Sequence, residues 1–217
     1  MTIHRVGRAL SSLAACGLLL AMSGVRAAAP TAAAPAATSD AVADFSVDHN
    51  PNGAWRYLAG ASLLGSVNHK DCDALGIACR WNGNPVCNSA IVAASTTGAP
   101  ASFLTIRLPA DHLLMDPESI ASVRVRWTAP AAGSYEIQGD FLGVDTSERS
   151  HPVAILEDAK QKIYSNTISS YGQQAAFDLT RKLARGETVD FVVSTGSACS
   201  YLSTGLKATV AAVTSGA

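Results

Sequence analysis

The sequence is poor in charged and aromatic residues, and each shortage excludes a class of protein. Charged residues make up 15% of the 217 residues, and the formal net charge is −1, which excludes a strongly basic nucleic-acid-binding protein. Aromatic residues make up 6%, so a stacking platform for a ligand is limited to one or two places. The remaining composition is typical of one β-rich exported domain rather than a disordered or coiled-coil chain.

Long hydrophobic runs are also scarce, and the clearest one, Ala9–Met22, lies close to the N-terminus. Basic residues precede this run, and Val25-Arg-Ala27 follows it in a form suited to cleavage. A run of about 14 residues is shorter than the roughly 20 that a membrane-spanning helix needs. The layout therefore predicts a secretory signal peptide over residues 1–27 and a secreted or periplasmic protein without a membrane span.

A second interpretation concerns Cys16. The segment Leu13-Ala-Ala-Cys16, followed by Gly17, resembles a bacterial lipobox, in which the cysteine is lipidated and anchors the protein to a membrane. Leu18–Leu20 continue the apolar run beyond the cysteine, where a polar tether is expected. Cleavage near Ala27 is therefore the favoured interpretation, and the lipid anchor is the alternative.

The residues after the predicted signal peptide are rich in alanine and proline. Pro30 and Pro35 interrupt any helix, and no apolar period is present. We predict a linker over residues 28–43 and a single domain over residues 44–213.

Four cysteines remain after signal cleavage, and an even count in an exported chain predicts two disulfides. Of the three possible connectivities, we favour Cys72–Cys79, which closes a short loop, with Cys87–Cys199 joining distant parts of the domain. The spacing contains no C-x2-C pair, which argues against a zinc site.

Apolar residues alternate with period two over much of the domain. Val123, Val125 and Trp127 share one strand face, as do Leu104, Ile106 and Leu108. Ala175–Leu183 also alternates and is predicted as a strand despite its helix propensity. Strands recur every 8–14 residues or so, with turn residues between them. The sequence therefore predicts an all-β fold, an antiparallel jelly-roll β-sandwich of about ten strands.

Residues 59–97 differ from the rest of the domain. They contain three of the four remaining cysteines, many Asn and Gly residues and little periodicity. We expect a long, disulfide-pinned loop excursion between strands, of the kind that often carries binding function.

Several segments together resemble exported bacterial jelly-roll domains found in proteins with a PEP-type sorting signal, which are similar to carbohydrate-binding modules. The segments are Asn50–Trp55, Val125–Tyr135, Phe141–Asp145, Leu183–Val193 and Ser203–Leu206. The resemblance implies a non-catalytic β-sandwich associated with a surface or matrix. The sequence departs from the pattern at Leu113–Pro117, where a His usually precedes the proline, and at Leu202, where an Asp is common.

Aromatic residues provide the candidate carbohydrate site, because aromatic faces pack on the apolar faces of sugar rings. Trp55, Tyr57 and Trp81 are the candidates, and Arg80, Asn82 and Asn84 would supply hydrogen bonds. Trp81 is the best candidate for an exposed aromatic, because it lies in a polar segment. Packing in the core is the competing interpretation for each aromatic residue, and it is favoured for Trp127.

One segment resembles half of a calcium-binding loop. Asp48, Asn50 and Asn52 precede Gly53 in the order D-x-N-x-N-G, which begins an EF-hand loop. Ala59 stands where that loop needs a bidentate Glu. A plain turn leading into the next strand is therefore favoured. Structural calcium is the only cofactor that the sequence suggests.

Catalytic motifs are not evident. His49, His69, His112 and His151 are scattered, and no G-x-S-x-G or H-E-x-x-H pattern occurs. Arg124 and Arg126 share one strand face, which either contacts an acidic glycan or is solvated without a ligand. The leading hypothesis is a non-catalytic secreted module that binds extracellular carbohydrate, matrix or another cell-envelope component. The alternatives are a structural or adhesion protein with a protein partner and, third, a small hydrolase or lyase.

Overall fold

The computed structural model describes residues 38–65, 72–81, 90–117, 121–196 and 200–213. The chain divides into two units, Met1–Ala34 and Pro35–Ala217, and all described residues belong to the second. The predicted signal peptide, the lipobox with Cys16, and the residues Asn82, Asn84, Cys87 and Cys199 lie outside the described residues. No helix in the described part of the chain is long and apolar enough to cross a membrane.

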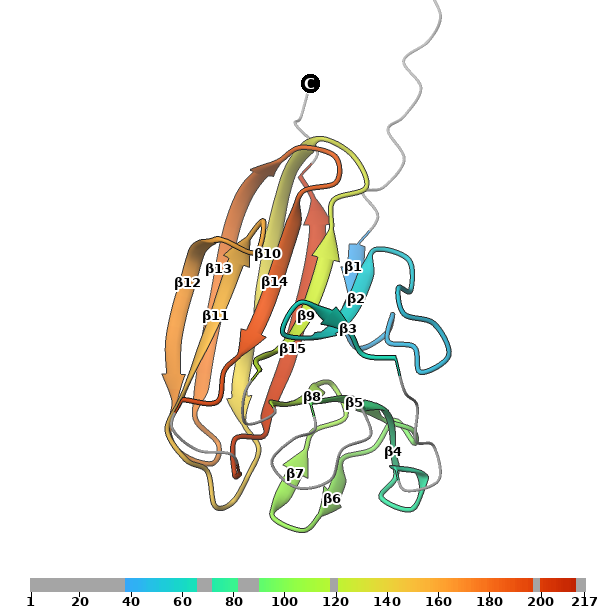
Figure 1. Cartoon of the computed structure of the whole chain (residues 1–217), viewed down its shortest axis with the longest axis vertical. Coiled ribbons are helices and arrows are strands. Elements are labelled where there is room, and N and C mark those ends of the chain that lie inside the picture. Colours follow the sequence, from blue (N-terminus) through green and yellow to red (C-terminus); the bar gives the residue numbers. More distant parts are fainter. Residues whose placement is uncertain (1–37, 66–71, 82–89, 118–120, 197–199, 214–217) are drawn as a thin grey trace, which may run out of the picture. The chain divides into compact units, whose positions relative to one another are not determined.

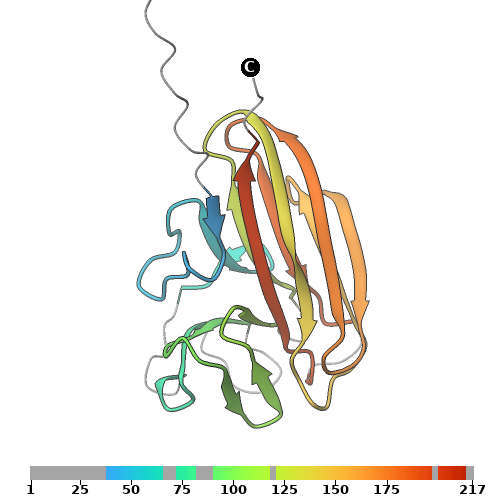
Figure 2. The same cartoon turned by 180° about the vertical axis from the view of Figure 1, so that it is seen from behind.

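The second unit is an antiparallel β-sandwich, as the sequence predicts. One sheet has seven strands in the order β13-β10-β15-β8-β5-β4, with β1 also paired to β15. Its strands are β1 (Thr38–Asp40), β4 (Ile77–Trp81), β5 (Ile91–Ser95), β8 (Leu113–Asp116), β10 (Gly133–Gly143), β13 (Gln174–Leu183) and β15 (Thr204–Ala212). Figure 2 shows β15, β10 and β13 of this sheet nearest the viewer.

The second sheet has six strands in the order β12-β11-β14-β9-β2-β3. Its strands are β2 (Trp55–Ala59), β3 (Ser62–Leu63), β9 (Val123–Thr128), β11 (His151–Glu157), β12 (Gln161–Ile168) and β14 (Thr188–Val193). In Figure 1, β11 and β14 of this sheet lie in front of β10 and β13. A separate hairpin is formed by β6 (Ala101–Phe103) and β7 (Ile106–Leu108).

The main core lies between the two sheets. The inward residues of each alternating strand are buried there, including Val125 and Trp127 from β9 and Ile137 and Phe141 from β10. Phe177 of β13 contacts Phe191 of β14 across the core, with 5.6 Å between ring centroids. In β9 and β13 the alternation buries one face and leaves the other face mostly polar, which is why the sequence signal is strong there.

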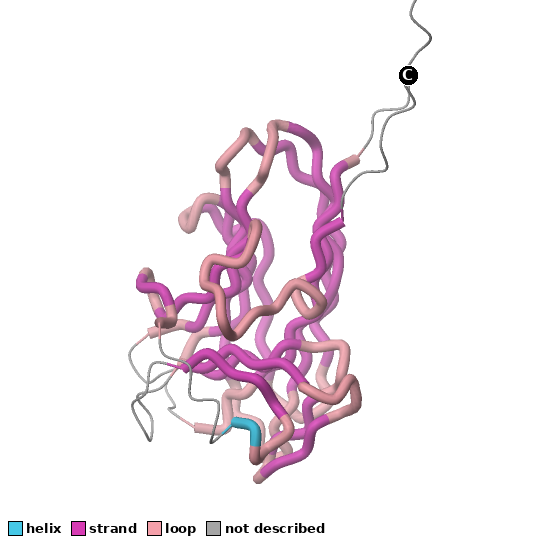
Figure 3. Tube along the Cα trace, turned by 90° about the vertical axis from the view of Figure 1, so that its right-hand side faces the viewer, coloured by secondary structure: helices cyan, strands magenta, loops and turns pink. Residues whose placement is uncertain are grey.

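A second core covers the other face of the β4-β5-β8 part of the seven-stranded sheet. It includes Ile77, Cys79, Leu108, Leu114 and Val144, and the β6–β7 hairpin packs on it. A short helical turn begins at Cys72 (Figure 3) and is joined to β4 by the Cys72–Cys79 disulfide. This disulfide confirms one of the two predicted pairs.

Three sequence predictions need correction. Strand β1 and the buried Ala41 belong to the sandwich, so the predicted linker over residues 28–43 extends too far. The predicted excursion over residues 59–97 contains β4 and β5. Apolar residues cover both faces of β5, so it does not alternate, whereas β4 turns Cys79 and Trp81 to the second core and has the buried Arg80 between them. Leu104 does not share a strand face with Ile106, because it occupies the hairpin turn with a φ of 47°.

Candidate functional site

Trp55 and Tyr57 lie in the main core and are not a sugar platform. Their exposed fractions are 1% and 0%. The Trp55 indole donates to the Asp44 carboxylate at 3.0 Å, and the Tyr57 hydroxyl donates to the Asp44 carbonyl at 3.3 Å. Burial raises the pKa of Tyr57 to about 12. The sequence-based assignment fails for these two residues because their strand turns this face toward the core.

Arg80 is also a structural residue and does not project to a ligand. It is 3% exposed, its Nε donates to the Ser46 carbonyl at 2.9 Å, and its Nη1 donates to the Leu64 carbonyl at 3.1 Å. Burial lowers its pKa, partly offset by the neighbouring Tyr57 and Asp48. The guanidinium therefore joins β4 to two loop segments of the domain.

The candidate calcium segment forms a turn at the entry to β2. The Asn50 amide donates to the carbonyls of Tyr57 and Leu64 at 2.8 and 2.9 Å, and its oxygen accepts the Tyr57 N–H at 3.0 Å. The Asn52 amide donates to the Asp44 carbonyl at 2.8 Å. The plain-turn interpretation accounts for both amides, while calcium binding by Asp48, Asn50 and Asn52 stays a prediction. No group of three acidic, His or Cys side chains suited to a metal occurs among the described residues.

Trp81 differs from the other two tryptophans in its position. It ends β4 and is half-buried. Its indole Nε1 is itself buried and has no hydrogen-bond partner among the described residues. The Trp127 Nε1 is likewise buried and without a partner among the described residues, but the Trp127 ring is 1% exposed and packs against Tyr135. Trp81 is therefore the aromatic residue of the predicted site whose ring stays partly exposed.

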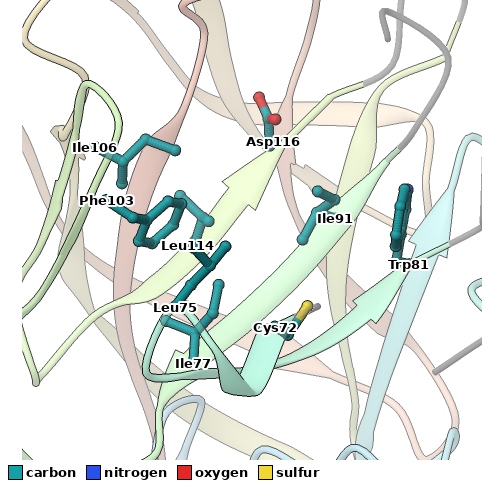
Figure 4. Close-up of a pocket in the computed structure, with 9 residues that line it drawn as sticks. All are labelled: Cys72, Leu75, Ile77, Trp81, Ile91, Phe103, Ile106, Leu114 and Asp116. Carbon is teal, nitrogen blue, oxygen red and sulfur yellow. The ribbon is translucent and has the colours of Figure 1, made fainter. Parts of the chain in front are cut away.

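Trp81 lines a pocket of about 180 Å³ (Figure 4). Strand pairing positions part of the wall, because Trp81 lies opposite Ile91 and Ile91 lies opposite Asp116. The β6–β7 hairpin contributes Phe103 and Ile106. The other lining residues are Cys72, Leu75, Ile77 and Leu114. The walls are almost wholly apolar, with Asp116 as the charged group among the lining residues.

The carboxyl of Asp116 is unusual because it lies at the edge of this apolar region. Burial raises its pKa to about 7, a hydrogen bond with Ser203 opposes that rise, and the neighbouring Asp145 adds to it. Near neutral pH this carboxyl therefore changes between a hydrogen-bond donor and a pure acceptor.

A buried polar cluster that the sequence did not reveal adjoins this region. Glu148 Oε2 accepts the backbone N–H of Asp145 at 3.1 Å, and Glu148 Oε1 lies 3.5 Å from His151 Nδ1. Burial raises the pKa of Glu148 to about 8, and it lowers the pKa of His151. His151 Nδ1 donates to the Arg149 carbonyl at 2.7 Å, and His151 Nε2 lies 2.7 Å from Thr204 Oγ1.

Glu148, His151 and Thr204 follow the order of a nucleophilic triad, but Glu148 Oε1 has no hydrogen-bond partner among the described residues and the hydroxyl is enclosed. Thr204 is 0% exposed, and its Oγ1 also lies 3.2 Å from the Leu202 carbonyl oxygen. A substrate cannot reach this oxygen without local unfolding, so the arrangement is a packed hydrogen-bond network. Its residues come from segments about 50 positions apart, which no local sequence pattern indicates.

A second histidine network lies on the outer side of the seven-stranded sheet. His112 Nδ1 lies 2.8 Å from Asp111 and His112 Nε2 lies 3.1 Å from Asp140, while Lys207 donates to Asp111 at 2.7 Å. Burial alone would lower the pKa of His112, but the hydrogen bonds to Asp140 and Asp111 outweigh burial and raise it. Both ring nitrogens face carboxylates, so the network holds an imidazolium in place.

Comparisons with known proteins leave the chain without a family. No family model and no curated protein matches it. Similar solved structures include family 35 carbohydrate-binding modules from Clostridium thermocellum and Paenibacillus barcinonensis. Their identities are 14% and 9%, they span 45% and 46% of this chain and 76% and 78% of theirs, and the TM-scores are 0.31 and 0.30. An arabinose-bound GH51 α-L-arabinofuranosidase is 10% identical over 73% of this chain and 23% of its own, with a TM-score of 0.35. TM-scores of this size carry no argument about fold or function.

Proposed function

We propose that the sandwich is a non-catalytic module of an exported protein and that it binds carbohydrate at the Trp81 pocket. The observation that carries the proposal is the half-buried Trp81 ring, which lines a pocket with apolar walls. A sugar ring presents an apolar C–H face and a rim of hydroxyls. The aliphatic walls and the Trp81 ring suit that face, and the Asp116 carboxyl suits the rim.

The size of the pocket limits the ligand. A volume of about 180 Å³ is below the roughly 300–1,000 Å³ of pockets that take drug-sized molecules. The pocket therefore suits one ring or chain end rather than a long stretch of polymer.

Export and the lack of catalysis have separate support. The Cys72–Cys79 disulfide is typical of an oxidising compartment, in agreement with a signal peptide over residues 1–27. The buried Thr204 is shielded from substrate, and the His112 network has two carboxylates as partners instead of a nucleophile. Both observations favour binding over a hydrolase or lyase.

A second candidate function is adhesion to a protein partner. Leu104 is 87% exposed at the turn of the β6–β7 hairpin, and Leu75 is 39% exposed beside the pocket. The two leucines would supply apolar contact area to a protein partner. Leu104→Ser is the variant that weakens binding if this candidate is correct.

The test compares two aromatic variants on a panel of neutral polysaccharides in affinity electrophoresis. We expect Trp81→Ala to weaken binding of the retained polysaccharide by roughly thirtyfold or more, because buried aromatic contacts dominate such sites. Tyr171→Ala is the matched control, because Tyr171 is 53% exposed in another turn of the domain. Equal binding by Trp81→Ala and the native protein, or no retained polysaccharide, would overturn the proposal.

A further inference from the structure

The outer face of the six-stranded sheet carries a row of basic side chains that the pocket does not involve. Strand register places Arg56 of β2 opposite Arg126 of β9, and Arg126 opposite Asp190 of β14. Asp190 lies opposite Leu156 of β11, which lies opposite Lys162 of β12. Three cations and one acid thus lie in one line across five neighbouring strands.

The single acid of this row is already neutralised. Arg126 donates to the two Asp190 oxygens at 2.6 and 2.8 Å, and the Asp190 side chain is 0% exposed. Arg124 lies 3.5 Å from the same carboxylate and adds a further cation. Four cations therefore surround one carboxylate on this face, and Asp158 adds a further negative charge near Arg126.

The basic row is bordered by a second row on the same face, which is apolar except for Arg124 and is called the apolar row. Register places Ala154, Val192, Arg124 and Leu58 in this line, two positions along each strand from the basic row. Leu58 and Val192 are buried at 3% and 5%, while Ala154 and Leu156 are partly exposed. The face therefore combines guanidinium donors with a small aliphatic contact area supplied by Ala154 and Leu156.

We propose that this face binds an acidic polysaccharide chain through its carboxylates. Neighbouring strands lie about 4.8 Å apart, so Arg56 and Lys162 are separated by roughly 19 Å, which suits several residues of an extended chain. Guanidinium and carboxylate match in geometry, as the Arg126–Asp190 pair shows on the same face. The partly exposed Ala154 and Leu156 suit the C–H face of a uronic-acid ring. Proteins that bind single-stranded nucleic acid stack its bases on aromatic side chains, and none lies in either row.

This face is a second ligand surface, distinct from the Trp81 pocket. Arg56 donates to the neutral Thr128 hydroxyl at 2.6 Å, and exchanging this partner for a ligand carboxylate needs little rearrangement. Lys162 is exposed on β12. In Figure 1 the sheet that carries both residues faces the viewer, with β12, β11 and β14 in front.

The test uses polygalacturonate in affinity electrophoresis at about 20 mM ionic strength, where surface charges are weakly screened. We expect the native protein to be retarded, and Arg56→Gln and Lys162→Gln each to weaken binding by roughly threefold. Lys182→Gln is the matched control, because Lys182 is exposed on β13 of the other sheet. It should bind as the native protein does.

Several results would overturn the proposal. They are the absence of retardation, equal weakening by Lys182→Gln and Lys162→Gln, and tighter binding of a single-stranded oligonucleotide of equal charge. Trp81→Ala should keep its affinity for polygalacturonate, and a loss would show that this face is not the site. If Trp81→Ala and the native protein both bind polygalacturonate but the native protein binds no neutral polysaccharide, the proposed function fails and this inference stands.

Discussion

Arg126 donates two hydrogen bonds of 2.6 and 2.8 Å to the carboxylate of Asp190, whose side chain has no exposed surface. A buried carboxylate needs such a partner, because an unpaired charge in this position costs several kcal/mol. The hydrogen bond to Asp190 is the main reason that the pKa of Arg126 is raised. The pair thus fixes β9 against β14 at the centre of the basic row.

Removing one partner of this pair should therefore destabilise the fold. We predict that Arg126→Ala lowers the free energy of unfolding by about 3 kcal/mol, because Arg124 at 3.5 Å compensates only in part. Arg56→Ala should cost less than about 1 kcal/mol, since Arg56 bonds only a neutral hydroxyl in the described structure. Urea unfolding of both variants checks this, and equal losses would contradict it.

A glycine in the middle of β10 should tolerate no side chain. Gly139 has a φ of 150°, and a Cβ at this position would meet the carbonyl oxygen of Lys207 on β15. We predict that Gly139→Ala lowers the free energy of unfolding by roughly 2–4 kcal/mol, because the two paired strands must separate. Gly172→Ala is the control, because Gly172 also has a positive φ but open space around it. A smaller loss for Gly139→Ala than for Gly172→Ala would refute the explanation by close approach.

The His112 network should stabilise the protein chiefly at acidic and neutral pH. Its carboxylate partners raise the pKa of His112 in the folded state, so the stabilisation is fully present below the unfolded value of about 6.5 and is lost as pH rises through the folded pKa. We predict that the Tm deficit of His112→Gln is largest near pH 5 to 6 and shrinks toward pH 9. A deficit that grows with pH would mean that His112 is neutral.

Glu148 should have a pH dependence of the same sign, because its pKa is also raised in the folded state. Burial raises its pKa from 4.5 to about 8 in the folded state, so ionisation opposes folding increasingly as pH rises from about 4.5 to 8. We predict that Glu148→Gln gains stability relative to the native protein over this interval. Melting curves at successive pH values measure the difference, and a difference independent of pH would show that the pKa of Glu148 is the same in the folded and unfolded states.

The sequence predicted the fold where strands have one buried and one solvated face. Val123, Val125 and Trp127 alternate with Arg124 and Arg126, and β9 follows that pattern. It failed at β5, because Ile91–Ser95 is covered by apolar residues on both faces and does not alternate. It also failed at β4, where the buried Arg80 interrupts the apolar residues of a short strand.

The candidate site was predictable only in part. The polar surroundings of Trp81 set it apart, whereas the burial of Trp55 depends on which face of β2 meets the opposite sheet. The cluster of Glu148, His151 and Thr204 depends on contacts between distant segments. Such contacts follow from the tertiary arrangement and leave no spacing signal in the sequence.

The three tryptophans provide the most direct test of binding at the pocket. Each indole N–H gives a separate amide-region NMR signal, and their surroundings differ: Trp55 donates to Asp44, Trp127 is in the core, and Trp81 lines the pocket. Titration with an oligosaccharide of the retained polysaccharide should shift the Trp81 indole signal and leave the other two unchanged. An unmoved Trp81 signal at a ligand concentration that saturates binding would contradict carbohydrate binding at this pocket.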